Sequence, residues 1–221
     1  CGRWNLRFPD EKPLCCSTIY RYIKRKEFPG INAKKHLRRR GKRITTKDSD
    51  YNTIHPDRLI PQWPKEIKSR ERIGDWEGDT VYGGVGKGLI VSMVDRKSRF
   101  LCAGLLKKRT ASETKDVIVS ILKDKPVKSI SFDNGSEFAE FQELEKVLKT
   151  QVYFAEPHKP WQRGTNENTN GILRFFFPKG FDFLSLSAEE LSAAVLLINL
   201  RPRKCLGWKT PFEVFYGVAL A

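Results

Sequence analysis

The order of apolar segments in the second half of the chain constrains the fold most. From residue 73 onward, short apolar runs bounded by turn residues alternate with segments whose apolar residues recur at helical spacing. The first three runs are joined by short turns, which predicts an antiparallel meander. We expect strands at residues 75–82, 89–94, 99–106, 127–132 and 152–154, and helices at residues 112–123, 137–150, 165–176 and 188–200.

This order of elements limits the possible folds. Three hairpin strands followed by helix, strand, helix, strand and helix is the element order of a ribonuclease H-like fold. That fold is α/β, with a mixed five-stranded sheet and helices on both faces. Other α/β folds share parts of the order, so the pattern favours this fold without requiring it. We assign the domain to residues 73–221.

Positive charge is concentrated ahead of this domain. Residues 1–72 hold 20 Lys and Arg against 8 Asp and Glu, whereas residues 73–221 hold 21 against 18. We predict a basic linker at residues 31–72 that contacts a polyanion. A solvated charged surface is the alternative. The predicted phosphate contacts in the linker are Lys34, Lys35, Arg38, Arg39, Arg40, Lys42 and Arg43.

The first thirty residues predict one short helix. Residues 15–28 carry apolar side chains at helical spacing, and Ser17 or Thr18 is the expected N-cap. This helix can be the end of a helix-turn-helix whose first helix is missing or incomplete. An amphipathic helix with no role on DNA is an equal alternative. Because the chain begins without Met and without a signal-peptide pattern, we expect a fragment.

Cysteine and histidine usage argues against zinc. The chain has five cysteines, no C-x-x-C pair and three histidines. An odd number of cysteines suggests reduced thiols in a cytosol. No run of about 18 apolar residues is present, so no transmembrane helix is expected.

A first candidate site residue is Asp133, which directly follows the apolar strand Ile130-Ser131-Phe132. The carboxyl ends of strands are where open α/β sheets bind ligands. The alternative is an aspartate that only caps the following helix.

Three more acids lie in the first strand. Asp75, Glu77 and Asp79 share one face of it, because side chains alternate along a strand. Three acids on one face near a core are costly unless cations compensate. Physical reasoning does not choose among them, and a solvent-facing edge strand is the alternative.

Glu167 is the one acid in the stretch PWQRGTNENTNG, residues 160–171. A surface loop would explain the Asn, Gly and Thr around it. If the segment is helical, Arg163, Glu167, Asn170 and Arg174 share one face, which suits a metal ligand beside a phosphate backbone. We therefore list Arg163, Asn170 and Arg174 as candidate DNA contacts.

Two Asp and one Glu without His or Cys suit Mg²⁺ or Mn²⁺ better than zinc, because these hard cations prefer oxygen ligands. Two such ions can activate a nucleophile and stabilise the leaving oxygen of a phosphodiester.

The motifs resemble the bacterial DDE transposases of the insertion-sequence-thirty (IS-thirty) family, over roughly residues 14–217. The resemblance is carried by STIYRYI, GDWEGDTVYG, VDRKSRF, FDNGSEFA, PHKPWQRGTNENTNGILRFFFPKG, INLRPRKCLGWKTP and FEVF. It implies an integrase-type catalytic core and places the catalytic and metal-binding triad at Asp79, Asp133 and Glu167. The choice of Asp79 over Asp75 and Glu77 comes from this resemblance.

The resemblance further implies DNA strand cleavage and strand transfer at the ends of an insertion sequence. The implied cofactor is Mg²⁺ or Mn²⁺, with two ions expected. Implied partners are terminal inverted repeats, target DNA and further copies of the chain in a synaptic complex, in the bacterial cytoplasm and at the nucleoid when bound. The family carries a longer N-terminal region than the partial helix-turn-helix remnant expected at residues 1–30.

Two other functions remain open at this point. One is a catalytically silent, truncated DNA-binding remnant that competes for element ends. The other is a simple ribonuclease H-like nuclease without joining activity.

Overall fold

The protein is described here by a computed structural model, which covers residues 1–37, 58–156, 159, 162 and 164–219. Within these ranges the chain divides into two units. The first comprises residues 1–49 and 202–210, and the second comprises residues 50–201 and 211–221. Within the described ranges, no helix combines the length and apolar character needed to cross a membrane.

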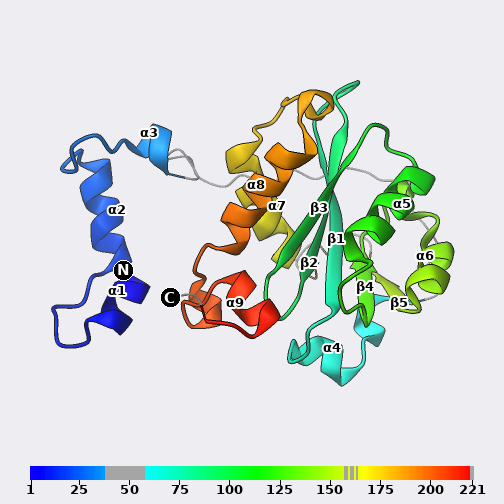
Figure 1. Cartoon of the computed structure of the whole chain (residues 1–221), viewed down its shortest axis with the longest axis horizontal. Helices are drawn as coiled ribbons and strands as arrows, with labels where there is room; N and C mark the ends of the chain where they lie inside the picture. The colour runs from blue at the N-terminus through cyan, green and yellow to red at the C-terminus, as the bar shows by residue number, and fades with distance from the viewer. Residues whose placement is uncertain (38–57, 157–158, 160–161, 163, 220–221) are drawn as a thin grey trace. The chain divides into compact units, whose positions relative to one another are not determined.

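The second unit is built on a five-stranded mixed sheet with strand order β3-β2-β1-β4-β5 (Figure 1). β1 pairs antiparallel with β2, and β2 antiparallel with β3, while β4 pairs parallel with both β1 and β5. The predicted meander and the predicted mixed sheet are confirmed. The strands are β1 (Asp75–Tyr82), β2 (Leu89–Asp95), β3 (Leu101–Leu106), β4 (Ser129–Phe132) and β5 (Gln151–Phe154).

Helices cover both faces of this sheet (Figure 1). On one side lie α5 (Ala111–Leu122) and α6 (Phe141–Leu148), packed on a core that includes Trp76 and Ile130. On the other side lie α7 (Gly164–Phe176) and α8 (Ala188–Asn199), packed on a core that includes Val81. Alternate β1 residues enter opposite cores, so the strand is buried on both faces.

Short elements complete the second unit: η1 (Ile60–Gln62), α4 (Lys65–Ser69), η2 (Ser136–Phe138), η4 (Phe183–Ser185) and α9 (Pro211–Tyr216). The sequence did not predict α9. Aromatic packing holds this helix against the sheet domain, because Phe215 stacks on Phe100 with ring centroids 4.4 Å apart. A proline at the first helical position was the available signal.

Two predicted boundaries need correction. The helix expected at residues 137–150 is split into η2 and α6, and α6 ends where Lys149 takes a left-handed conformation, φ +50°. The strand expected from Arg99 begins at Leu101, because Arg99 itself has φ +63°, which no strand residue adopts.

The end of the predicted linker belongs to the folded second unit. Ile60, Trp63 and Ile67 are buried and pack against Tyr153 and Ala155 of β5 and its extension. Leu59 also forms an isolated bridge with Phe154. Apolar side chains spaced through residues 59–67 therefore outweigh the prolines that suggested an irregular linker. Residues 38–57 of the predicted linker lie outside the described part of the chain.

The first unit holds α1 (Gly2–Arg7), α2 (Cys16–Lys24), α3 (Ala33–His36) and η5 (Lys204–Leu206). The sequence did not predict α1. A Cβ at Gly2 would lie 2.0 Å from the Trp208 ring, so glycine allows this helix to pack on residues 202–210. The expected capping of α2 by Ser17 or Thr18 is wrong, because its N-cap is Cys15 and no side chain caps it. A role on DNA for this unit stays a prediction.

Candidate active site

Asp75, Glu77 and Asp79 all point to the α7 and α8 side of β1. Trp76 belongs to the core under α5, and Val81 to the core under α7 and α8. The odd-numbered acids lie on the same face as Val81 because side chains alternate along a strand. The three acids lie in a row, but their partners differ from one end of the row to the other.

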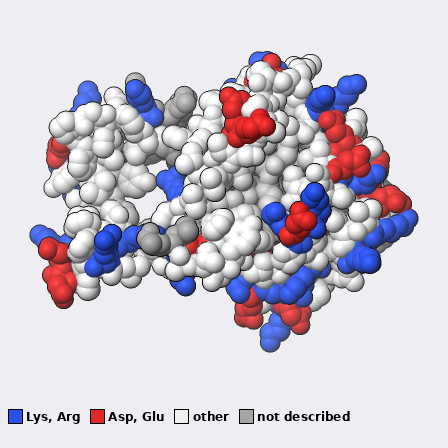
Figure 2. All heavy atoms as spheres, in the orientation of Figure 1, with Lys and Arg blue, Asp and Glu red and all other residues white. Residues whose placement is uncertain are grey.

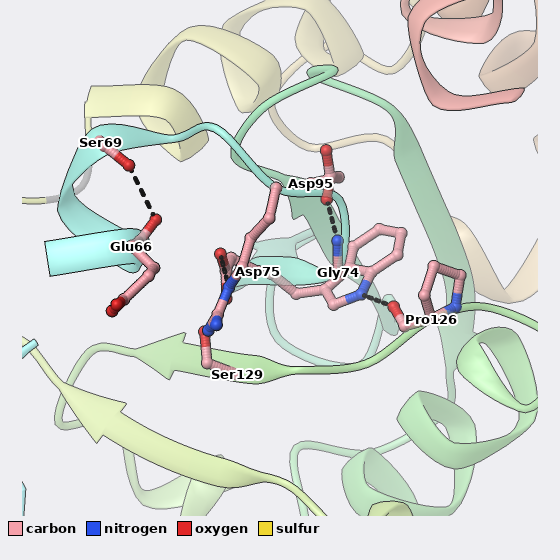
Figure 3. Close-up of polar contacts among 9 residues, drawn as sticks. Glu66, Ser69, Gly74, Asp75, Asp95, Pro126 and Ser129 are labelled. Atoms are coloured by element: carbon pink, nitrogen blue, oxygen red, sulfur yellow. Dashed lines mark hydrogen bonds and ion pairs between the residues drawn. The ribbon is translucent and has the colours of Figure 1, made fainter. Parts of the chain in front are cut away.

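Asp75 is fully buried and forms an ion pair with Arg72 (Figure 3). Arg72 donates from Nε to Oδ2 at 2.8 Å and from Nη2 to Oδ1 at 2.9 Å, and Ser129 donates its hydroxyl to Oδ1 at 2.6 Å. The hydrogen bonds to Asp75 raise the pKa of the Arg72 guanidinium. A bidentate pair of this kind stabilises a buried carboxylate.

Glu77 is also fully buried and forms an ion pair with Arg96, whose side chain is 3% exposed. The Arg96 guanidinium lies over the Trp63 ring, 4.0 Å from its centroid. Burial lowers the pKa of Arg96, and Glu77 acts in the opposite direction. Arg96 therefore links β1 to the segment that precedes it, and this acid has a structural partner.

Asp79 lies in a different environment at the carboxyl end of β1, where it is half-buried. Its Oδ2 accepts a hydrogen bond from Asn170 Nδ2 at 2.8 Å, and its Oδ1 accepts one from the backbone N–H of Thr80 at 2.8 Å. The Ser92 hydroxyl donates to Asn170 Oδ1 at 3.1 Å. These hydrogen bonds orient a carboxylate that is partly exposed to solvent.

Asp133 directly follows β4, the strand that pairs parallel with the first half of β1. Asp75 pairs with Ser129 and Glu77 with Ser131, an offset of 54 residues, and the same offset takes Asp79 to Asp133. The backbone N–H of Gly135 donates to Asp133 Oδ1 at 3.1 Å. The N-cap of η2 is Gly135, so Asp133 forms a turn rather than capping the following helix.

Glu167 lies in α7, one turn before Asn170. Asn166 Nδ2 donates to the Gly78 carbonyl at 3.1 Å, and Asn170 donates to Asp79, so this turn of α7 is anchored on β1 at both sides of Glu167. Residues three apart on a helix are neighbours. Glu167 is exposed. The loop interpretation is wrong for residues 164–171, which are helical.

The three carboxylates therefore come from β1, from the residue after β4 and from α7, which contacts β1 through Asn166 and Asn170. Within the described ranges, however, no three His, Cys, Asp or Glu side chains lie close enough together to hold one metal ion. The donor set itself is made of carboxylate oxygens from β1, the end of β4 and α7, which is the ligand chemistry of Mg²⁺ and Mn²⁺.

The predicted DNA contacts have different settings. Asn170 is engaged with Asp79, and Arg174 Nη2 donates to the Tyr82 carbonyl at 2.7 Å. Burial lowers the pKa of Arg174. Lys35 is exposed on α3, which also contains Lys34. Arg38, Arg39, Arg40, Lys42, Arg43 and Arg163 lie outside the described residues.

Sequence analysis did not predict two sets of contacts around the candidate site. Arg99 Nη1 donates to Thr165 Oγ1 at 3.0 Å, which fixes the first turn of α7. Glu137, 3% exposed, accepts hydrogen bonds from Thr80 and Arg109. The signal for Glu137 was its place in FDNGSEF, an acid between the candidate Asp133 and a buried phenylalanine.

Comparison with known proteins shows which sequences this chain is similar to. A family model described as an integrase core domain matches residues 70–160. A transposase for insertion sequence element IS4351 from Bacteroides fragilis is 37% identical, over 90% of this chain and 62% of that protein. The transposase InsI for insertion sequence element IS30A from Escherichia coli K12 is 35% identical, over 96% of this chain and 59% of that protein. The chain thus contains an integrase core domain and is similar to insertion-sequence transposases over most of its length.

The fold of this chain has a solved counterpart. A chain in the cryo-EM structure of a simian T-cell lymphotropic virus intasome, in complex with PP2A regulatory subunit B56 gamma, aligns with a TM-score of 0.56 and 27% identity. The alignment covers 67% of this chain and 56% of that one. The ribonuclease H-like fold predicted from the order of elements is confirmed, and so is the integrase-type core that the resemblance implied.

The chain spans about three fifths of the length of the curated relatives it matches. Transposases and integrases with this core use divalent metal ions.

Proposed function

We propose that this chain cleaves DNA strands at the ends of an insertion sequence and joins them to target DNA, with Asp79, Asp133 and Glu167 as its catalytic residues. The observation that supports this most is the contrast along β1. Asp75 and Glu77 are buried against arginines, whereas Asp79 is half-buried and accepts a hydrogen bond from Asn170, one helical turn from Glu167 on α7.

The same three carboxylates would hold Mg²⁺ or Mn²⁺, and we infer two ions. Bound there, the metal would act as a Lewis acid on a phosphodiester and lower the pKa of an attacking hydroxyl. The chain's own part is positional. Asn170 and the Thr80 N–H orient Asp79, and Arg99 and Asn166 fix the helical turn that carries Glu167.

DNA is the proposed partner, as terminal inverted repeats and as target. The basic run that contains Arg38–Arg40, Lys42 and Arg43 would contact phosphates, and Lys34, Lys35, Arg163 and Arg174 are further candidates. On the face drawn in Figure 2, acidic and basic side chains lie side by side along the edge formed by α5 and α6. That mixture of charges supports phosphate contact through the basic linker more than through the surface of α5 and α6. A homo-oligomeric synaptic complex is the expected working form.

The proposed location is the bacterial cytoplasm, with the protein at the nucleoid when it is bound to DNA. All five cysteines are free thiols in the structure, two of them adjacent and exposed. Free exposed thiols persist in reducing compartments.

The test is incubation with a labelled duplex that carries the terminal inverted repeat of the insertion sequence encoding this chain. With Mg²⁺, we expect nicked and joined products from that duplex and none from a scrambled repeat. Asp79→Asn and Asp133→Asn should each abolish both products while the protein stays folded, because each loses a ligand that stabilises the transition state.

The outcomes separate the alternatives. Nicking of repeat and scrambled duplex alike, without joining, would indicate a simple nuclease. Retention of the repeat without nicking in either Mg²⁺ or Mn²⁺ would indicate a silent DNA-binding remnant. Glu140→Gln is the matched control, because Glu140 is an acid paired with Lys115 at 2.8 Å and has no part in the proposed site.

A further inference from the structure

A buried carboxylate outside the acidic face of β1 lies beside the proposed metal site. Glu137 is in η2, four residues after Asp133, and is 3% exposed. Thr80 Oγ1 donates to its Oε1 at 2.8 Å, and Arg109 Nη2 donates to its Oε2 at 2.7 Å. A buried carboxylate is unfavourable without such partners. Glu137 therefore connects the end of β1, the loop after β4 and the residue ahead of the α5 N-cap.

The first connection leads to Asp79. Thr80 donates its backbone N–H to Asp79 Oδ1 and its hydroxyl to Glu137 Oε1, both at 2.8 Å. Because both donors belong to one residue, holding the hydroxyl also restricts the peptide group that orients the Asp79 carboxylate. Glu137 thus acts on Asp79 through a single intervening residue.

The second connection leads to Asp133. Gly135 donates its backbone N–H to Asp133 Oδ1 at 3.1 Å. A Cβ added at Gly135 would lie 2.5 Å from Glu137 Oε2 and 2.9 Å from Asp133 Oδ1. The Glu137 carboxylate therefore packs directly against the backbone of the turn that orients Asp133, and only glycine fits between the two carboxylates.

We propose that Glu137 is a positioning residue that sets the spacing of Asp79 and Asp133, with Thr80 and Gly135 as its two links and Arg109 as its counter-charge. This rests on the proposed function, since it concerns the same metal ligands. Two like charges resist being held close together. A rigid scaffold around both reduces the rearrangement that a cation would otherwise have to drive, and partners of this kind govern metal affinity.

The decisive variant is Thr80→Val, which keeps the branched shape and the backbone N–H but removes the hydroxyl. Binding of Mn²⁺ is measured from the free-ion electron paramagnetic resonance signal, at a temperature well below every melting transition. We expect the half-saturating Mn²⁺ concentration to rise about tenfold in Thr80→Val. Thr80→Ser, which restores the donor, should return it to the wild-type value.

Glu137→Gln supplies the second arm. It preserves the shape of the side chain but removes the charge that faces Arg109, so Mn²⁺ binding should weaken to a similar extent. In the double variant the two effects should not add, because both act through one linkage. Glu140→Gln removes the charge of an acid three residues after Glu137 that is paired with Lys115 of α5, and it should bind Mn²⁺ as the wild type does.

A merely structural role makes a different prediction. Thr80→Val would then lower the melting temperature in chelator and leave the half-saturating Mn²⁺ concentration unchanged, which would refute the positioning role. If Glu137→Gln fails to fold, the comparison of Thr80→Val with Thr80→Ser still decides. If the wild type binds no Mn²⁺, the proposed metal site fails and the positioning role falls with it. Saturable wild-type binding with an unaffected Thr80→Val overturns the positioning role alone.

Discussion

Acidic residues in the first and second halves of β1 lie in different environments. At the amino-terminal end, Asp75 and Glu77 are fully buried and each is paired with an arginine. At the carboxyl end, Asp79 is half-buried, and its carboxylate accepts hydrogen bonds from an amide and a backbone N–H. All three acids lie on one face of one strand, so their difference comes from what the rest of the fold places opposite them.

This difference shows how an acidic strand can serve both stability and chemistry. A buried acid with an arginine is neutralised and fixed, and it cannot approach a solvated ligand. A half-buried acid that accepts hydrogen bonds from an amide and a backbone N–H, as Asp79 does, is partly in contact with solvent. The two ends should therefore respond differently to loss of charge, in folding stability at one end and in catalysis at the other.

The largest effect on stability is expected at Glu77. Glu77→Leu leaves the Arg96 guanidinium buried without its carboxylate, which should lower the free energy of unfolding by about 3–5 kcal/mol in urea titrations. The double variant Glu77→Leu/Arg96→Met removes both charges and should recover most of the loss. If Glu77→Leu is as stable as the wild type, Glu77 is not a structural acid and does not differ from Asp79 in this respect.

A smaller effect is expected at Asp75. Asp75→Asn retains the shape but breaks the charge-assisted contacts with Arg72, which is partly exposed. The free energy of unfolding should fall by about 1.5–3 kcal/mol, as for other hydrogen bonds to charged groups. Urea unfolding at neutral pH and low salt measures it, and Arg72→Met should give a loss of the same sign.

A pH-dependent effect is expected at Asp95. This residue ends β2 beside Trp76 of β1 and accepts a hydrogen bond from Gly74 N–H at 2.8 Å (Figure 3). Burial raises the pKa of the Asp95 carboxyl above its usual 3.8, and hydrogen bonds from Ser98 and Gly74 oppose the shift. A raised pKa means that the folded state binds the proton more tightly than the unfolded state does. Its contribution to stability is therefore greatest below pH 3.8 and declines as pH rises toward the folded pKa.

Asp95→Asn should remove this dependence. The difference in unfolding free energy, wild type minus variant, should decrease as pH rises from 3.8 through the folded pKa of Asp95, and then level off. Urea titrations at a series of acidic pH values measure it. A difference that increases with pH over that window would contradict the assigned direction.

The smallest effect on stability is expected at Asp79. Asp79→Asn keeps an acceptor for the Thr80 N–H and removes a charge that solvent reaches, so the free energy of unfolding should change by no more than about 1 kcal/mol. Thermal melting in chelator measures it alongside Glu77→Leu. A loss as large as that of Glu77→Leu would mean that Asp79 is a structural acid like its neighbours.

The fold was predictable because its elements are encoded locally. Apolar runs of strand length, Gly-rich turns and helices with apolar faces gave the meander, the two parallel additions and the covering helices. The misses arose where long-range packing overrode local pattern. Ile60, Trp63 and Ile67 anchor a segment that looks irregular by sequence, and α9 depends on Phe100, more than a hundred residues earlier in the chain.

The candidate site divides in the same way. The sequence by itself determined that three acids share a face of the expected first strand and that Asp133 follows a core strand, because alternation is a local property. For Glu167 it left a surface loop and a polar helical face as alternatives. Only the tertiary structure decided which acid of β1 is partly exposed. That choice depends on Arg72, Arg96 and Asn170, which the fold brings to β1 from three different segments. Burial and ion pairing are properties of the assembled neighbours, so no pattern within DWEGD could reveal them.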